Sequence, residues 1–290
     1  MANIKELKKR IKSTKSTLKI TSAMKLVSAA KLSKAQNKIQ GFKPYSSNLD
    51  QTIRIASALN TDYSHEFLEE KPEVEKSILL VVSSSKGLCG GYNAQLFKNV
   101  RNFLKQEGTP FAIYHIGRKV KELLAREGVE AKKTFEFAKA DPTYEEIKAV
   151  AEELAKEFTE SNVGRVFIAY NSFVSAIEFN PTVSKILPLT VDESEKEELL
   201  KEYPVDFIYE PSPKELLDDL IPEVFTTTIY TNILDAIAAE HGARMTAMDN
   251  ATNNSKDMIR NLTLTANKLR QAAITTELTE IVSGAESLNS

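Results

Sequence analysis

The chain lacks tryptophan, and it has one cysteine, Cys89, and three histidines among its 290 residues. A single cysteine excludes a disulfide within the chain and is typical of a reducing compartment. His65, His115 and His241 are too widely spaced to indicate a metal site. No apolar run approaches the roughly 20 residues that cross a bilayer, and the basic start has no apolar signal segment. We therefore expect a cytosolic protein.

Glycine and proline are scarce at both ends. Neither occurs between Ala2 and Gln40, and only Gly242 interrupts the stretch from Glu223 to Ser283. Both stretches are predicted to be long helices, and the second would reach about 90 Å at 1.5 Å per residue. Because such a helix outreaches any ordinary domain core, it needs a partner helix or a surrounding sleeve. The other end of the chain supplies a candidate partner.

A three–four spacing of apolar and small residues follows both stretches, which indicates a coiled coil. Ala, Thr and Ser interrupt the hydrophobic residues, so at roughly 25 cal/mol per Å² the seam would bury little apolar area. An ordinary helical bundle has the same periodicity and stays open as an alternative. Gly41 and Pro44 predict a break or kink after the first seam, with the helical pattern resuming over Tyr45–Asn60. The first seam is Ile4, Leu7, Ile11, Thr14, Leu18, Thr21, Lys25, Ser28, Leu32, Ala35 and Ile39; the second is Leu234, Ala238, His241, Met245, Met248, Thr252, Ser255, Ile259, Leu262, Ala266, Leu269, Ala273 and Thr276.

Charge is distributed unevenly, although the net charge is only −2. Up to Lys43 there are about a dozen Lys and Arg residues against one acid, Glu6, whereas acids gather at 66–75 and 192–202. A basic helix indicates a solvated face, a nucleic-acid surface or a helix that faces an acidic protein. The polar, mostly uncharged C-terminal stretch favours the last of these.

The middle of the chain predicts an α/β class domain. Strands alternate with helices, which is typical of a largely parallel, Rossmann-like sheet. We expect three regions: an N-terminal coiled-coil helix (1–60), the α/β domain (74–211) and a C-terminal coiled-coil helix (212–290), so that the domain is inserted in a long antiparallel helical hairpin. Strands are expected over Ser77–Ser83, Pro110–Ile116, Val163–Asn171 and Ile177–Leu187, and helices over Tyr92–Gln106, Arg118–Arg126, Tyr144–Glu160 and Ser212–Leu220.

A glycine-rich segment, SSSKGLCGGYN at Ser83–Asn93, follows the first expected strand. Phosphate-binding loops occupy this position, but the segment matches neither the Walker A nor the GxGxxG pattern. A structural loop is the favoured interpretation and a nucleotide site the weaker one. Cys89 has no base nearby in the sequence, so an inert thiol is expected. Carboxylate pairs such as Glu145–Glu146 are typical of a solvated helix face. No catalytic, metal or cofactor-binding residues are predicted.

The segment Ile274–Leu288, ITTELTEIVSGAESL, closely resembles the C-terminal signature of the γ subunit of F-type ATP synthases. The chain lacks the cysteine-containing insertion of the light-regulated chloroplast form, so it is identified as a member of this family of the bacterial type. Four further segments resemble the family in the same order: ITSAMKLVSAAKL at Ile20–Leu32, GLCGGYN at Gly87–Asn93, YEPSP at Tyr209–Pro213 and HGARMTAMDNATNNS at His241–Ser255.

The resemblance implies the central rotor stalk of an ATP synthase. In this family the terminal helices form an antiparallel coiled coil inside the α3β3 head, and the α/β domain lies with the ε subunit on the membrane ring of c subunits. Rotation couples proton or sodium flow to ATP synthesis or hydrolysis. The subunit has no catalytic site and no cofactor, binds no nucleic acid, and is peripheral at the cytoplasmic face of the cell membrane.

Subunit contacts are also implied by matching motifs. On the helices they are Met24, Lys25, Arg270, Gln271 and Thr275, for which plain coiled-coil packing is the alternative. Near the ring and ε they are Gly87, Leu88, Cys89, Gly90, Gly91 and Tyr209. One departure is that Ser85 stands before Lys86, where the family usually has an acid. Two other functions remain open: a nucleotide-dependent α/β enzyme that uses Gly87–Gly91, and a basic coiled coil that binds nucleic acid.

Overall fold

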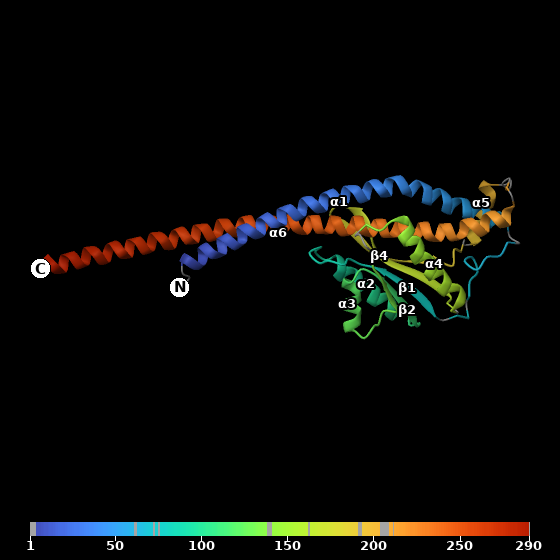
Figure 1. The fold of residues 1–290 in the computed structure, drawn as a ribbon, viewed down its shortest axis with the longest axis horizontal. Helices are drawn as coiled ribbons and strands as arrows, with labels where there is room; N and C mark the ends of the chain where they lie inside the picture. Colours follow the sequence, from blue (N-terminus) through green and yellow to red (C-terminus); the bar gives the residue numbers. More distant parts are fainter. Residues whose placement is uncertain are drawn as a thin grey trace. The chain divides into compact units, whose positions relative to one another are not determined.

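The computed structural model describes residues 4–60, 63–71, 73–74, 76–137, 141–161, 163–190, 193–203, 209–210 and 212–289. The chain divides into two compact units, Met1–Ser28 with Met245–Ser290, and Ala29–Arg244. Helices α1 (Ile4–Leu59) and α6 (Pro213–Asn289) each contribute to both units. Figure 1 shows both helices as continuous ribbons and labels α2, α3, α4, β1, β2 and β4 of the α/β unit. The expected domain limits at 60, 74, 211 and 212 remain a prediction.

The larger unit contains a five-stranded sheet in the order β3-β2-β1-β4-β5. The strands are β1 (Ser77–Val82), β2 (Phe111–Ile116), β3 (Lys133–Phe135), β4 (Arg165–Ser175) and β5 (Glu178–Leu187). All neighbouring pairs are parallel except β4 and β5, which form an antiparallel hairpin. The largely parallel sheet is therefore confirmed. The sequence interpretation missed β3, a three-residue strand at the sheet edge.

Two apolar layers cover the central strand β1, in which all six residues are buried. Leu79 and Val81 face a layer built with α2 (Tyr92–Glu107) and α3 (Lys119–Arg126). Ile78, Leu80 and Val82 face a second layer built with α4 (Tyr144–Glu160) and the parts of α1 and α6 that belong to this unit. Burial on both faces explains why this strand is a continuous apolar run rather than an alternating one.

Helix α1 continues through Gly41 and Pro44, so the break is wrong, and the kink given as its alternative stays a prediction. Proline in a helix interior removes a backbone hydrogen bond and clashes with the preceding turn. Packing on both sides of Pro44 holds the helix together: the Phe42 ring meets Tyr230 edge-on at 4.9 Å between centroids, and Ile53 is buried in the core. The structure also adds α5 (Glu193–Glu202), a short charged helix that the sequence interpretation did not predict.

The smaller unit is a coiled coil of the two chain ends, as predicted. Every seam residue from Ile4 to Ser28 is buried or partly buried, and so is every seam residue from Met245 to Ala273, whereas Thr276 is exposed. The polar part of the seam is bridged by a hydrogen bond from the Thr252 hydroxyl to the Thr21 hydroxyl, at 2.9 Å. Small, polar seam residues thus let the helices approach closely. None of the described helices combines the length and the apolar character needed to span a bilayer.

Candidate functional site

The glycine-rich loop between β1 and α2 presents one leucine outward and its neighbouring cysteine inward. Leu88 is 63% exposed, whereas Cys89 is only 2% exposed. Leu88 has φ = 64° and Gly90 has φ = 58°, both in the left-handed region. A leucine seldom adopts that conformation because its side chain crowds the backbone there. The loop therefore needs contacts that hold its backbone in place.

Asn93 supplies the first set of these contacts from the start of α2. Its Nδ2 donates to the Ser84 hydroxyl at 2.7 Å and to the Cys89 sulfur at 3.2 Å. Its Oδ1 accepts a hydrogen bond from the Ser84 backbone N–H at 3.2 Å. Asn93 thus links Ser84, at the start of the loop, to Cys89, and its amide contacts the thiol. The GLCGGYN motif includes this residue, but nothing in the sequence indicated its role.

Arg244 supplies the second set from α6. Its Nη2 donates to the carbonyl oxygens of Lys86 at 3.2 Å and Gly87 at 3.3 Å, and its Nε donates to Gly87 at 3.4 Å. Glu240, one turn earlier on the helix, forms an ion pair with Arg244 Nη1 at 2.7 Å. The Arg244 side chain is only 10% exposed. The sequence interpretation did not single out Arg244 or Glu240, because the contact joins residues 157 positions apart.

Burial changes the titration of the groups around Arg244. It raises the pKa of the Glu240 carboxyl, and the adjacent guanidinium partly opposes that rise. Burial, together with the positive charges of Arg244 and Lys31, lowers the pKa of His241 to about 4. His241 is therefore neutral near pH 7, which allows its Nδ1 to accept a hydrogen bond from Arg244 Nη1, 3.4 Å away.

These contacts favour the structural interpretation of the loop over the nucleotide interpretation. The carbonyls of Lys86 and Gly87 bind Arg244, and the Cys89 thiol contacts Ser84 and Asn93 rather than a catalytic base. A phosphate cradle needs free backbone N–H groups that converge on the ligand. Among the described residues, no group of His, Cys, Asp and Glu side chains is arranged to hold a metal ion.

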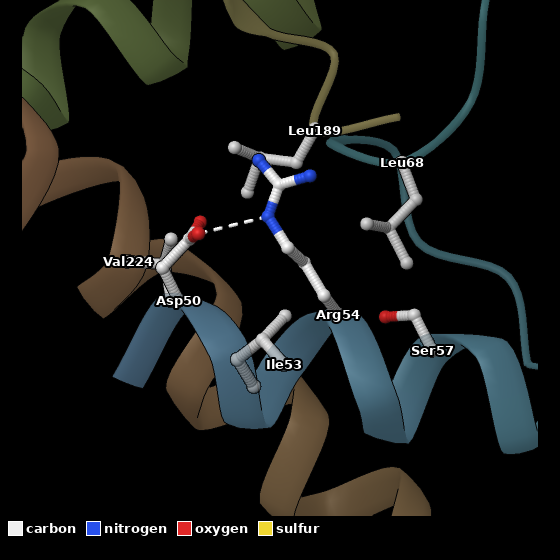
Figure 2. A pocket seen from close by; sticks show the side chains of 7 residues that line it. All are labelled: Asp50, Ile53, Arg54, Ser57, Leu68, Leu189 and Val224. Carbon is white, nitrogen blue, oxygen red and sulfur yellow. Dashed lines mark hydrogen bonds and ion pairs between the residues drawn. The ribbon is translucent and has the colours of Figure 1, made fainter. Parts of the chain in front are cut away.

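A small hollow lies beside α1 in the same unit, with an empty volume of about 240 Å³ (Figure 2). Arg54 crosses it and pairs with Asp50 at 2.8 Å, while the buried Ser57 hydroxyl has no hydrogen-bond partner. None of the residues that line the hollow comes from the glycine-rich loop, so it does not extend that loop into a nucleotide site. It is lined by Asp50, Ile53, Arg54, Ser57, Leu68, Leu189 and Val224.

The expected contact residues of the coiled coil fall into two groups. Met24 and Lys25 are partly buried, and Lys25 Nζ pairs with Asp249 at 2.6 Å. Arg270, Gln271 and Thr275 are exposed and lie off the seam. Their exposure argues against simple helix packing as their role. Contact with another subunit stays a prediction for all five.

Tyr209 is partly buried and packs against the main core, and its hydroxyl oxygen accepts a hydrogen bond from Asn60 Nδ2 at 2.8 Å. This anchors the residue beside the end of α1. Its expected contact with a partner also stays a prediction. Pro211, within the same YEPSP segment, lies outside the described residues.

Large apolar side chains are exposed along both helices of the coiled-coil unit. Four of them, Ile274, Leu278, Ile281 and Val282 on α6, recur at three- and four-residue spacing and therefore share one face of the helix. An exposed apolar stripe of this kind is typical of an interaction surface. The sequence periodicity did not identify these residues, because they lie off the seam or after its last residue, Thr276. They are Ile20, Leu26 and Val27 on α1, and Met258, Leu264, Ile274, Leu278, Ile281 and Val282 on α6.

Comparison with known proteins gives one consistent result. A family model described as ATP synthase matches residues 3–288. The ATP synthase gamma chain of Geotalea daltonii is 43% identical and that of Bdellovibrio bacteriovorus 40% identical, each over 99% of both chains. A solved structure of the central stalk and c-ring of the Tetrahymena thermophila mitochondrial ATP synthase shares the fold, with a TM-score of 0.62 and 21% identity over 80% of this chain and 99% of that one. A rotor structure of the Euglena gracilis mitochondrial ATP synthase gives a TM-score of 0.64 at 18% identity, covering 93% and 98%. The chain belongs to the family of bacterial F-type ATP synthase gamma chains.

Proposed function

We propose that this chain is the central rotor stalk of an F-type ATP synthase, which transmits torque between an ion-driven membrane c-ring and a catalytic α3β3 head. The observation that carries the proposal is the set of large apolar side chains that stay exposed along both helices of the coiled coil. A paired-helix shaft inside a ring of subunits would bury such a surface. Family membership supports the same role.

The chemistry of the shaft surface suits rotation. The exposed Asn261, Thr263 and Thr265 are uncharged, and each threonine hydroxyl donates to a carbonyl of its own helix. Fixed ion pairs with a surrounding ring would favour particular angles, whereas a neutral surface leaves the shaft free to turn. Exposed ion pairs contribute about 0–1 kcal/mol each, enough for short-lived contacts by the basic N-terminal helix.

The remaining assignments follow from this role. We assign residues 74–211 to contacts with ε and the c-ring, and the helical regions 1–60 and 212–290 to contacts with α and β. The chain has no catalytic site or cofactor of its own, and it works at the cytoplasmic face of the cell membrane as a peripheral part of the complex.

Reconstitution tests the proposal. The purified chain alone should hydrolyse no ATP, and ion-coupled ATP synthesis in vesicles should require it together with the other subunits. Leu264→Asp should weaken association with α3β3, whereas Asn261→Asp, which adds the same charge nearby on the helix, should not. Full ion-coupled synthesis without the chain would overturn the proposal.

Two control measurements separate the alternative functions. ATP binding by the full chain in calorimetry would support a nucleotide-dependent enzyme. Nucleic-acid binding that weakens steeply with salt, and that disappears when the N-terminal lysines are neutralised, would support the basic coiled coil.

A further inference from the structure

We propose that Arg244 is a positioning residue that fixes the exposed tip of the Ser85–Gly91 loop, so that Lys86 and Leu88 meet a partner subunit in one orientation. The inference rests on the proposed function only for the existence of that partner. The geometry itself is internal to the Ala29–Arg244 unit.

The guanidinium is suited to this task because it is a rigid, planar fork. It donates to two consecutive carbonyls of the loop, those of Lys86 and Gly87, from Nη2 and Nε. A lysine ammonium is a single flexible donor centre and cannot reproduce that geometry. Of the two carbonyls, Lys86 also accepts from the Ser84 hydroxyl at 2.8 Å, so Gly87 depends more on Arg244.

The loop tip needs such support because it makes few other contacts. Residues 85–88 are all exposed, and the Leu88 backbone is held at φ = 64°. Backbone in that region costs on the order of 1–3 kcal/mol for a residue with a side chain and persists only when surrounding contacts enforce it. Asn93 holds Ser84 and Cys89 at the two sides of the tip, whereas Arg244 reaches the tip itself from α6.

Glu240 and His241 in turn fix the orientation of Arg244. Glu240 pairs with Nη1 at 2.7 Å, and the neutral His241 faces the same nitrogen at 3.4 Å. The remaining nitrogens, Nη2 and Nε, are left to point at the loop. Because Arg244 and Glu240 are both largely buried, removal of one leaves the other charge poorly compensated.

The lone thiol provides a direct reporter of loop position in the full chain. Cys89 lies beneath the tip and is the only cysteine, so its modification rate by a thiol reagent measures how often the loop opens. Trypsin cleavage after Lys86, followed by mass spectrometry, measures the same motion independently. Arg244→Met should raise both rates at least tenfold, and Arg244→Lys should raise them less. If Arg244→Met does not fold, Arg244→Lys, which keeps the charge beside Glu240, provides the same test.

Two controls separate positioning from general destabilisation. Arg260→Met removes an exposed arginine on the same helix and should change neither rate. Leu124→Ala loosens the apolar layer on the other face of the sheet and should lower stability without selectively exposing Cys89. Unchanged rates in folded Arg244 variants, or an equal rise in Leu124→Ala at matched stability, would overturn the proposal.

The functional measurement uses the reconstituted complex. Arg244→Met should assemble normally but lower ion-coupled ATP synthesis severalfold more than ATP hydrolysis, with partial recovery in Arg244→Lys. A loop that opens without any change in coupling would also contradict the proposal. Failure of the rotor function itself would be recognised differently, because the unaltered chain would then neither assemble with α3β3 nor support synthesis.

Discussion

Lys25 and Asp249, 224 positions apart in the sequence, form an ion pair of 2.6 Å between the two helices of the coiled coil. The pair lies within a stretch of the seam where Thr21 and Thr252 replace the usual large hydrophobic residues. A polar pair at such a position specifies which residues of two helices face each other. Lys25 is therefore a register-setting residue as well as an expected partner contact.

A double-mutant cycle tests this role. Both side chains are about 40% exposed, 41% for Lys25 and 43% for Asp249, so Asp249→Asn should lower the free energy of unfolding by less than about 1 kcal/mol. Asp249→Lys should lower it more, and the exchange Lys25→Asp with Asp249→Lys should recover most of that loss. Denaturant unfolding followed by circular dichroism measures each variant. Glu6→Gln, which breaks an exposed pair within α1, is the control. Additive effects at positions 25 and 249 would contradict the coupling.

For Arg270 and Gln271 we expect an effect on function rather than on stability, because both side chains are exposed and lie off the seam. Arg270→Ala and Gln271→Ala should change the free energy of unfolding by no more than about 0.5 kcal/mol. Each should leave assembly with α3β3 intact but lower ion-coupled ATP synthesis severalfold. Lys268→Ala, at another exposed position of the same helix, is the matched control. Normal synthesis by the assembled Arg270 and Gln271 variants would remove them from the contact surface.

Secondary-structure elements with a clear pattern of apolar residues within their own segment could be predicted from the sequence. The apolar run of β1, the amphipathic face of α4 and, apart from the exposed Thr276, the two seams appear where the periodicity placed them. Elements that depend on distant packing were missed. β3 has only three residues and follows from its pairing with β2, and the helix through Pro44 follows from the contact between Phe42 and Tyr230.

The same distinction applies to the glycine-rich loop. Its position between strand and helix could be read from the glycines, and its burial of Cys89 agrees with the expected unreactive thiol. The contact with Arg244 could not be predicted, because no local pattern links Gly87 to a residue 157 positions away. The exposed apolar residues of the coiled coil could not be predicted either. Periodicity shows which residues share a helix face, but it does not show which faces stay exposed.

Gly242 shows how a single helical glycine can reflect close packing. A Cβ built there would lie 3.0 Å from the carbonyl oxygen of Ala176 in the turn between β4 and β5. Replacing a helical glycine by alanine usually gains about 1 kcal/mol of stability, as expected for Gly41→Ala, where the added atom meets nothing. Gly242→Ala should gain little or none of this, and Gly242→Val should lose on the order of 2 kcal/mol. Denaturant unfolding compares the three variants. An equal gain at positions 41 and 242 would show that the turn gives way freely.

The buried His115 should make the folded chain less stable in mild acid. The residue is 1% exposed, and its Nδ1 has no hydrogen-bond partner among the residues that the structure describes. Burial, together with the positive charge of Lys121, lowers the pKa of His115 to about 4 from an ordinary value of 6.5. Because the folded pKa is depressed, the unfolded chain binds a proton first as the pH falls below 6.5. The stabilisation present at pH 7 is therefore lost progressively between pH 6.5 and 4, by on the order of 2 kcal/mol at pH 5.

The variant His115→Leu separates this contribution from that of His241, whose pKa is also lowered to about 4. Leucine suits the apolar layer that contains Val81 and Ile113, and it removes the unpartnered nitrogen. The variant should match the unaltered chain at pH 7 or exceed it slightly, and it should lose about half as much stability between pH 7 and pH 5. Denaturant midpoints at the two pH values measure both quantities. His65→Leu is the control, because His65 is more exposed and burial lowers its pKa less. If His115→Leu and the unaltered chain show the same pH dependence, His115 is protonated equally in the folded and unfolded states.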